Sequence, residues 1–171
     1  MPRFGAKLTF VLAFLALSSA SAADNSLSLQ ANEAFLAANA NKPGVVTRPS
    51  GLQYRIIHNG FGKSPKAPDS VDVYYTGSLI NGIVFDKTEP GMPANLKVNA
   101  VIPGWTEALE IMREGDHWQL VIPANLAYGT RGAGGVIPPN QTLIFDLELV
   151  KVVPAPKDEN SSQDQDQSSQ Q

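Results

Sequence analysis

The sequence predicts an α+β fold, in which an antiparallel sheet of about five strands wraps around one short helix. Runs that alternate apolar and polar residues recur between residues 47 and 153, and a period of two is typical of strands with one buried face. An Asn81-Gly82 pair stands between two such runs, as in a tight hairpin. Inside this region only residues 103–112 space their apolar side chains as a helix does. We therefore expect one folded domain over residues 47–153.

The first 22 residues have the pattern of a cleaved secretory signal peptide. Arg3 and Lys7 give a positively charged start, residues 8–17 are apolar, and small residues follow up to Ala22. A membrane anchor is the alternative, but a spanning helix needs about 20 apolar residues and this run is shorter. We therefore expect cleavage near Ala22 and export of the rest of the chain.

Residues 23–46 are expected to form an N-terminal helix and a linker. The helical pattern covers residues 26–40, with Asn25 or Ser26 as the N-cap, and residues 42–44 (Lys-Pro-Gly) end it. An isolated helix of about 15 residues is marginal in water, so this one has to dock on the domain or fray.

The strands of the domain are expected at residues 52–57, 71–80, 83–85, 118–122 and 142–153, with a further short one at 96–98. The Asn81-Gly82 pair favours a type I′ turn, which needs a positive φ at both residues. The final segment alternates most clearly, and its apolar residues are Leu143, Phe145, Leu147 and Leu149.

The one helix inside the domain is expected at residues 103–112. Pro103 suits the first helical turn because its missing N–H would be unpaired there in any case. Trp105, Leu109 and Met112 then share one face, and Gly115 follows as a stop. Such a helix can cover one face of a sheet and close a core.

Residues 154–171 are rich in Gln, Ser and Asp and carry no large apolar side chain. Such a segment cannot bury enough surface to offset its chain entropy, so we expect a disordered tail.

Composition excludes several kinds of chemistry. The absence of cysteine removes disulfides, thiol nucleophiles and Cys-based zinc sites, and a net charge of -3 does not suggest a nucleic-acid partner. Neither of the two histidines, His58 and His117, lies in a candidate pocket segment, so triad catalysis and a His-rich metal site have little support. Residues 132–135 lack the Lys-Ser/Thr of a phosphate loop. We expect no metal and no cofactor.

Five aromatic residues and one carboxylate form the candidate site: Tyr75, Phe85, Trp105, Tyr128 and Phe145, with Asp86 directly after Phe85. Any single ring could be ordinary core. Tyrosine and tryptophan, however, carry a polar handle that suits a pocket wall. Asp86 could equally cap a turn or hold a carboxylate at a pocket rim. A site of this composition would bind an apolar group without attacking it.

The segment from Ala124 to Gln141 is expected to be a flap. Loops longer than about 12 to 15 residues in compact domains are usually functional or disordered. This one carries apolar side chains, so it is expected to fold over an apolar surface; they are Leu126, Tyr128, Val136 and Ile137.

Five short motifs occur in order along the domain: YYTG at 74–77, NGIVFD at 81–86, VIPGW at 101–105, AYG at 127–129 and IPPNQTLIFD at 137–146. Over residues 50–153 this set resembles the FKBP-type peptidyl-prolyl cis-trans isomerases. The preceding segment, residues 32–54, is similar to the join between helix and catalytic domain in secreted, Mip-like bacterial members. We expect their long N-terminal region to be shortened here to about one helix.

The resemblance implies a role for each site residue. Trp105 would be the floor of a proline pocket, with Asp86 at the rim. Two positions depart from many relatives: Leu96 stands where an aromatic is common, and Ala133 where some have a histidine. The implied catalytic residues are Tyr75, Phe85, Asp86, Trp105, Tyr128 and Phe145, and the implied substrate-binding residues are Leu96, Val101, Ile102, Val136 and Ile137.

The implied activity is acceleration of X-Pro bond rotation in unfolded or nascent exported polypeptides. The resemblance also implies binding of macrolide inhibitors and a periplasmic or secreted location in a bacterium. The main alternative is a periplasmic holdase that uses the same groove without needing isomerase activity. A more distant one is a structural or adhesive protein that uses the sheet edge.

Overall fold

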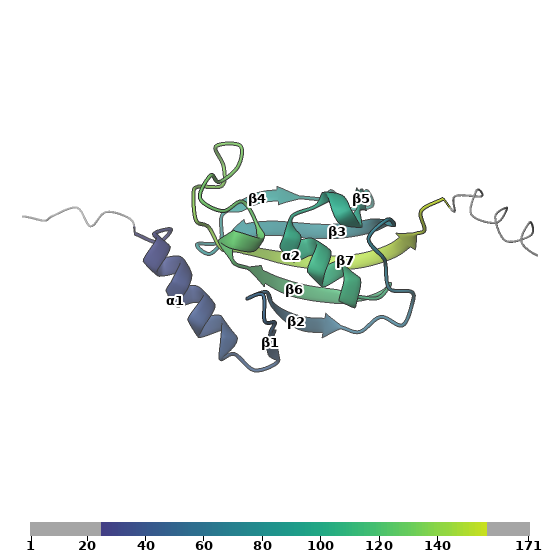
Figure 1. The fold of residues 1–171 in the computed structure, drawn as a ribbon, viewed down its shortest axis with the longest axis horizontal. Coiled ribbons are helices and arrows are strands. Elements are labelled where there is room, and N and C mark those ends of the chain that lie inside the picture. The colour runs from purple at the N-terminus through teal and green to yellow at the C-terminus, as the bar shows by residue number, and fades with distance from the viewer. Residues whose placement is uncertain (1–24, 157–171) are drawn as a thin grey trace, which may run out of the picture.

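The computed structural model describes residues 25–156 (Figure 1). The expected signal peptide and most of the expected tail lie outside these residues. The described elements are α1 (Leu29–Ala40), β1 (Val45–Thr47), β2 (Gln53–His58), β3 (Ser70–Leu79), β4 (Val84–Lys87), β5 (Ala94–Lys97), the 3₁₀ turn η1 (Val98–Ala100), α2 (Pro103–Ile111), β6 (His117–Ile122), the 3₁₀ turn η2 (Ala124–Leu126) and β7 (Leu143–Val153).

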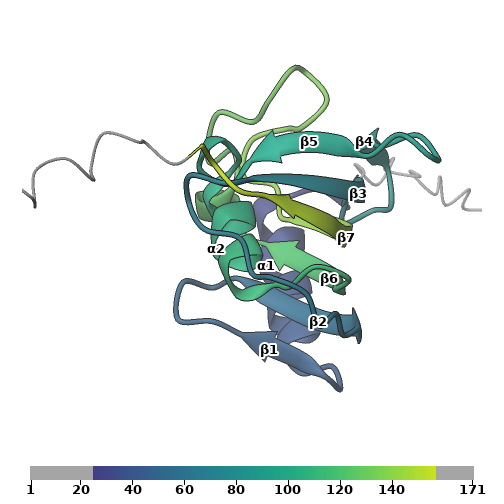
Figure 2. The same ribbon diagram turned by 90° about the vertical axis from the view of Figure 1, so that its right-hand side faces the viewer.

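The strands form one antiparallel sheet in the order β1-β2-β6-β7-β3-β4, with β5 pairing to β3. The sheet curves around α2 (Figures 1 and 2). Helix α1 lies beyond one end of the strands, and the C-terminal end of β7 lies at the opposite end. The predicted fold class is confirmed. The expected number of strands was too low, because the sheet has seven and β1 was assigned to the linker. Three residues are too few to show a period, and β1 exists because Val46 pairs with Tyr54 of β2.

The centre of the sheet is the long pair β3 and β7, which runs from Ser70 opposite Val153 to Leu79 opposite Leu143. Alternate residues of both strands point to the concave face and are fully buried, among them Val71, Val73, Leu147 and Leu149. This face and α2 enclose the hydrophobic core, as the alternating pattern predicts.

Helix α2 lies against the concave face with Pro103 in its first turn. Trp105 and Leu109 are buried, and Met112 ends the helix as its C-cap. A Cβ on Gly104 would lie 2.5 Å from Cγ2 of Ile122 on β6, so only glycine allows the helix to approach the sheet this closely.

The β3–β4 hairpin forms where expected, but the type I′ turn was wrong. Gly82 has a φ of +86°, whereas Asn140 is the only non-glycine residue of 25–156 with a positive φ. The N–H of Gly82 donates to the Leu79 carbonyl at 2.9 Å, as in a three-residue loop that ends in a left-handed glycine. The Asn81 Oδ1 accepts the Ile83 N–H at 3.1 Å, so the Asn side chain stabilises this turn without a positive φ of its own.

Helix α1 docks on the end of the sheet, as its marginal length requires. Ser28, not Asn25 or Ser26, is the N-cap, and its hydroxyl accepts the Ala31 N–H at 3.1 Å. The buried face of the helix is polar and consists of Asn32 and Asn39. Neither α1 nor α2, the helices of residues 25–156, is long and apolar enough to cross a bilayer.

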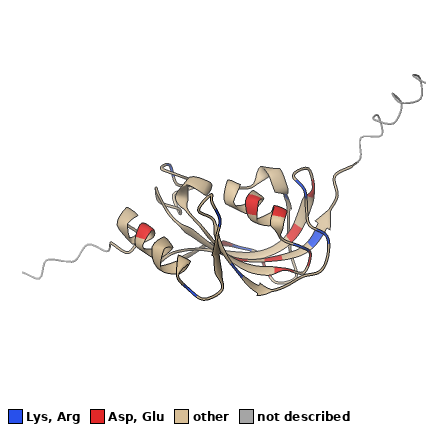
Figure 3. Ribbon diagram, turned by 60° about the horizontal axis from the view of Figure 1, so that its bottom comes forward, with Lys and Arg blue, Asp and Glu red and all other residues tan. Residues whose placement is uncertain are grey.

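In the view of Figure 3, acidic residues occur on both helices and on the sheet, and basic residues are dispersed among the loops and strands. They do not gather into a basic stripe in that view.

Candidate active site

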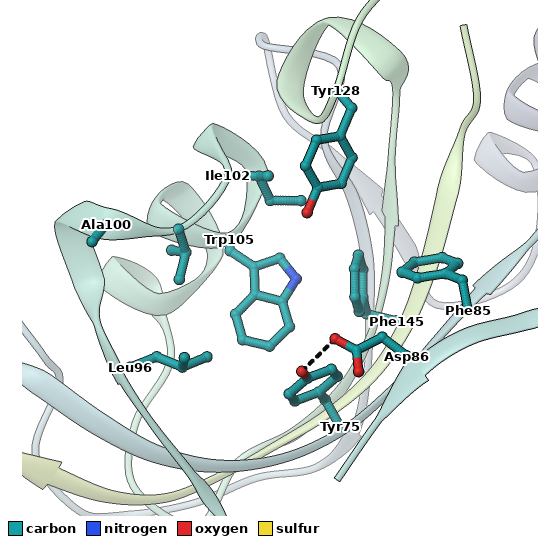
Figure 4. A pocket seen from close by; sticks show the side chains of 10 residues that line it. Tyr75, Phe85, Asp86, Leu96, Ala100, Ile102, Trp105, Tyr128 and Phe145 are labelled. Atoms are coloured by element: carbon teal, nitrogen blue, oxygen red, sulfur yellow. Dashed lines mark hydrogen bonds between the residues drawn. The ribbon is translucent and has the colours of Figure 1, made fainter. Parts of the chain in front are cut away.

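A cavity of about 440 Å³ opens between the concave face of the sheet, the start of α2 and the flap. Nine of the eleven expected site residues line it, together with Ala100, which sequence analysis missed. Figure 4 shows these side chains converging on one space from β3, β4, β5, α2, β7 and the flap. The lining residues are Tyr75, Phe85, Asp86, Leu96, Ala100, Val101, Ile102, Trp105, Tyr128 and Phe145.

The floor of the cavity is a set of rings in edge-to-face contact. The Trp105 and Phe145 centroids are 5.2 Å apart with their planes at 86°, and Tyr75 meets Trp105 at 5.2 Å and 90°. Phe85 completes the set against Phe145 at 5.7 Å and 86°. These perpendicular contacts are the arrangement that aromatic quadrupoles prefer, so the rings hold each other in position.

Among residues 25–156 the buried indole N–H of Trp105 has no hydrogen-bond acceptor. Figure 4 shows its nitrogen directed at Phe145, whose ring plane is perpendicular to the indole. The two rings therefore meet edge to face. The floor therefore offers an apolar group close contact and offers no strong hydrogen bond.

Gly77 makes the ring packing possible, a role that sequence analysis did not assign. A Cβ there would lie 2.7 Å from Cε1 of Phe145 and 2.8 Å from two ring atoms of Phe85. Strand β3 passes directly against both rings, so the position has no room for a side chain. Its place in the YYTG motif was the only signal in the sequence.

The polar rim consists of Tyr75 and Asp86. The Tyr75 hydroxyl donates to Oδ2 of Asp86 at 2.6 Å (Figure 4). Burial is the main cause that raises the pKa of the Tyr75 phenol well above its usual value, and the hydrogen bond to Asp86 raises it further. Tyr75 therefore stays protonated and keeps donating to Asp86. Of the two roles considered for Asp86, the structure places its carboxylate at the rim.

The flap contributes Tyr128 to the cavity. This side chain is 41% exposed, and Figure 4 shows its hydroxyl directed into the space beside Ile102.

Val136 and Ile137 do not line the cavity, contrary to expectation. The flap tip closes on itself, because Ala133 and Ile137 exchange both backbone hydrogen bonds, at 2.9 and 3.0 Å. Ile137 is consequently buried in the core at 6% exposure, while Val136 is 59% exposed at the tip. The sequence carries no side-chain signal for this turn.

Both histidines lie away from the cavity. His58 Nδ1 is 3.2 Å from the Gly115 carbonyl, and His117 Nε2 is 2.7 Å from Oδ1 of Asp146. Within residues 25–156 no cluster of three or more side chains is suited to hold a metal ion.

Comparison with known proteins places this fold in the FKBP class. The family profile described as FKBP-type peptidyl-prolyl cis-trans isomerase matches residues 62–150. A second profile, described as the domain amino terminal to FKBP-type peptidyl-prolyl isomerase, matches residues 10–56. This chain belongs to the FKBP-type peptidyl-prolyl cis-trans isomerase family.

Three relatives illustrate the likeness. The outer membrane protein MIP of Legionella longbeachae is 56% identical over 121 residues, covering 70% of this chain and 52% of its own. The FKBP-type 22 kDa peptidyl-prolyl cis-trans isomerase of Escherichia coli strain K12 is 52% identical over 120 residues, covering 70% of this chain and 58% of its own. A crystal structure of a peptidyl-prolyl cis-trans isomerase from Pseudomonas syringae pv. tomato has a TM-score of 0.70 at 39% identity, covering 74% of this chain and 93% of that chain.

The Mip-like resemblance is thereby confirmed. The chain spans about half the length of the curated relatives it matches.

Proposed function

We propose that this chain accelerates cis–trans rotation about X-Pro bonds in polypeptides. The observation that carries the proposal is the ring-floored cavity itself, which accepts a compact apolar group and has no serine, cysteine, lysine or histidine among its lining residues. Proline is such a group. Rotation about the bond before it needs no covalent chemistry, only a lower barrier.

The physical basis is the difference in polarity between the planar and the twisted amide. The barrier of about 18–20 kcal/mol arises from resonance, which separates charge in the planar form. Water supports that charge, and an apolar cavity does not, so transfer into the cavity costs the planar form more than the twisted one. A millionfold acceleration needs about 8 kcal/mol of such differential stabilisation.

Two hydrogen-bond donors are placed to hold the substrate backbone. The N–H of Ile102 has no acceptor within residues 25–156 and stands at the N-cap of α2, where the helix dipole favours a carbonyl oxygen. The Tyr128 hydroxyl faces the same space. We assign both to carbonyl groups that flank the prolyl bond, with Asp86 and Tyr75 at the rim.

A matched pair of tryptophan variants tests the proposal. Trp105→Phe keeps an apolar filler but removes the indole floor, and it is expected to lower kcat/KM on a short X-Pro peptide by about tenfold or more, equivalent to about 1.4 kcal/mol. The control is Trp118→Phe, since Trp118 is equally buried at 4% exposure but stacks on Tyr54 outside the cavity. A protease-coupled assay measures both, with a macrolide inhibitor as reference. Equal losses in the two variants would refute the assignment.

A holdase that uses the same groove is the second candidate, and the comparisons do not favour it, because the relatives are named as isomerases. Asp86→Asn separates the two. An isomerase loses activity towards X-Pro peptides in this variant, whereas a holdase still suppresses aggregation of an unfolded client to the same extent.

We propose that the clients are unfolded or nascent exported polypeptides with X-Pro bonds, and that the protein acts in the bacterial periplasm or outside the cell. Support comes from the signal-peptide pattern of residues 1–22 and from the Legionella relative, which is named as an outer membrane protein. Mass spectrometry of the protein expressed in a bacterium is expected to find a mature N-terminus near residue 23. An intact Met1 in the exported fraction would contradict cleavage.

A further inference from the structure

Helix α1 holds one end of the flap through the buried side chain of Asn32. Its Oδ1 accepts the Thr142 N–H at 2.7 Å, and its Nδ2 donates to Oε1 of Gln141 at 3.2 Å. All three residues are at most 3% exposed. We call Asn32, Gln141 and Thr142 the Asn32 clamp.

The sheet does not provide these hydrogen bonds. The ladder between β6 and β7 ends at the pair Ile122 and Leu143, so Thr142 lies one residue beyond it. The Gln141 amide, in turn, donates to the carbonyls of Leu27 and Pro139 at 3.0 and 2.9 Å. The C-terminal end of the flap is therefore anchored to α1 and to the residue that precedes its cap.

The clamp continues to the cavity wall through two backbone hydrogen bonds. Asn140, next to Gln141, donates its N–H to the Gly129 carbonyl at 2.8 Å, and the Gly129 N–H donates to Ala124 at 2.8 Å. These bonds close the neck of the flap directly beside Tyr128. Asn140 has a φ of +61°, so the neck is built on a conformation that few residues adopt.

Side-chain packing between α1 and the flap neck is incomplete, although Ala127 and Ile137 on either side of the neck pack on the core. A space of about 290 Å³ lies between α1 and the flap neck, lined in part by Leu29, Leu36, Gly129 and Asn140. Loss of the hydrogen bonds would therefore let the neck shift on the side that faces α1.

We propose that Asn32 is a positioning residue for the active site: α1 sets the position of Tyr128 over the cavity through the Asn32 clamp. This inference rests on the proposed isomerase function. Because the Tyr128 hydroxyl is assigned to a substrate carbonyl and is not part of the ring floor, we expect the effect in substrate binding and therefore in KM.

The same helix supplies a matched control. Asn39 is also buried, at 4% exposure, and its Nδ2 donates to Oε1 of Gln53 on β2 at 2.8 Å. The Gln53 amide donates to the Leu36 carbonyl at 3.0 Å, and within residues 25–156 its side chain makes no hydrogen bond to the flap. Asn39→Ala therefore weakens the docking of α1 without releasing Tyr128.

The test compares Asn32→Ala, Gln141→Ala and Asn39→Ala with the wild type. All three are expected to lower the urea midpoint. Only the two clamp variants are expected to raise KM for an X-Pro peptide, by about threefold or more, with kcat within about twofold of wild type. Amide hydrogen exchange at Asn140 is expected to accelerate by about threefold or more in the clamp variants alone. Combining Asn32→Ala with Gln141→Ala is expected to raise KM by less than the product of the single effects.

Two results would overturn the inference: a KM and an Asn140 exchange rate in the clamp variants equal to those of Asn39→Ala, or strictly multiplicative effects in the double variant. If Asn32→Ala does not fold, Gln141→Ala against Asn39→Ala decides it. If the wild type shows no isomerase activity, the proposed function fails, and Asn140 exchange alone then decides whether α1 holds the flap.

Discussion

At the scale of single residues, Tyr75 joins the two halves of the site. Its ring meets Trp105 edge to face, and its hydroxyl bonds Asp86 at 2.6 Å. One side chain thus fixes both the apolar floor and the charged rim. Burial first, and the bond to Asp86 second, raise the pKa of its phenol.

This pKa has a consequence for stability at alkaline pH. The folded chain holds the Tyr75 proton more tightly than the unfolded chain, whose tyrosine has a pKa of about 10. The contribution of Tyr75 to the free energy of unfolding is therefore complete below about pH 10 and is lost as the pH rises further. In Tyr75→Phe we expect a shallower fall of the free energy of unfolding between about pH 9 and 11 than in the wild type. Urea unfolding at several pH values measures it, and parallel curves would count against this account.

At the scale of elements, strand β3 supports the cavity because it has no side chain at Gly77. The strand runs between β7 and β4 and passes against the rings of Phe145 and Phe85. A bulge between Gly77 and Ser78 in its pairing with β4 shifts the register just where Phe85 and Asp86 enter the cavity. Bulges often re-aim side chains in this way.

We expect Gly77→Ala to displace one of the two rings and narrow or distort the cavity. The overpacking should cost about 1–3 kcal/mol of stability. Isomerase activity should fall by more than this loss of folded protein explains. Ser78→Ala, one residue along the same strand, is the control and should leave both properties near wild type. A crystal structure of Gly77→Ala with Phe85 and Phe145 unmoved would show that the close approach is not required.

At the scale of the whole molecule, the buried carboxylate of Asp116 joins segments that are distant in sequence. It accepts the N–H groups of Gly60 and Arg113 at 2.6 and 2.7 Å, and its own carbonyl accepts the N–H of Leu149 at 2.9 Å. The loop after β2, the loop after α2 and strand β7 meet at this residue. It lies at the loop end of α2, whereas the cavity includes the first turn of that helix.

Asp116→Ala would leave two backbone donors without their acceptor. We expect a loss of about 2–6 kcal/mol, since each buried unpaired group costs about 1–3 kcal/mol. Asp72→Ala is the comparison, because the Asp72 carboxylate accepts an exposed hydrogen bond from Asn95, and loss of this carboxylate should change stability by no more than about 0.5 kcal/mol. Thermal unfolding measures both, and similar midpoints for the two variants would refute the role given to Asp116.

Much of the fold could be predicted because its signals are local. The alternation of β7 and the Trp105-Leu109-Met112 spacing of α2 each record one buried face, and both elements lie where expected. The β1 strand could not be found in this way, because its three residues have no period and depend on a partner strand. The turn at Asn81-Gly82 was placed but mistyped, since a bulge in the same hairpin changed the register.

The site residues, too, could be predicted from the sequence only in part. Trp105, Tyr75 and Phe145 could be named because ordered motifs carry them, and the cavity brings them together. The direction of Val136 and Ile137 depends on a turn that the flap makes with its own backbone, which leaves no trace in side-chain type. The role proposed for Asn32 could not be predicted either. A helical asparagine is expected to face solvent, and Asn32 is buried only because residues 141–142 hydrogen-bond to it.

The sequence by itself determined both helices, most of the strands and the family motifs that the chain carries, because periodicity and motif spacing are properties of neighbouring residues. Only the tertiary structure decided which face α1 buries, where the flap tip points and how Gly77 makes room for two rings. These depend on contacts between residues far apart in the chain, and the free energy of such contacts has no local signature.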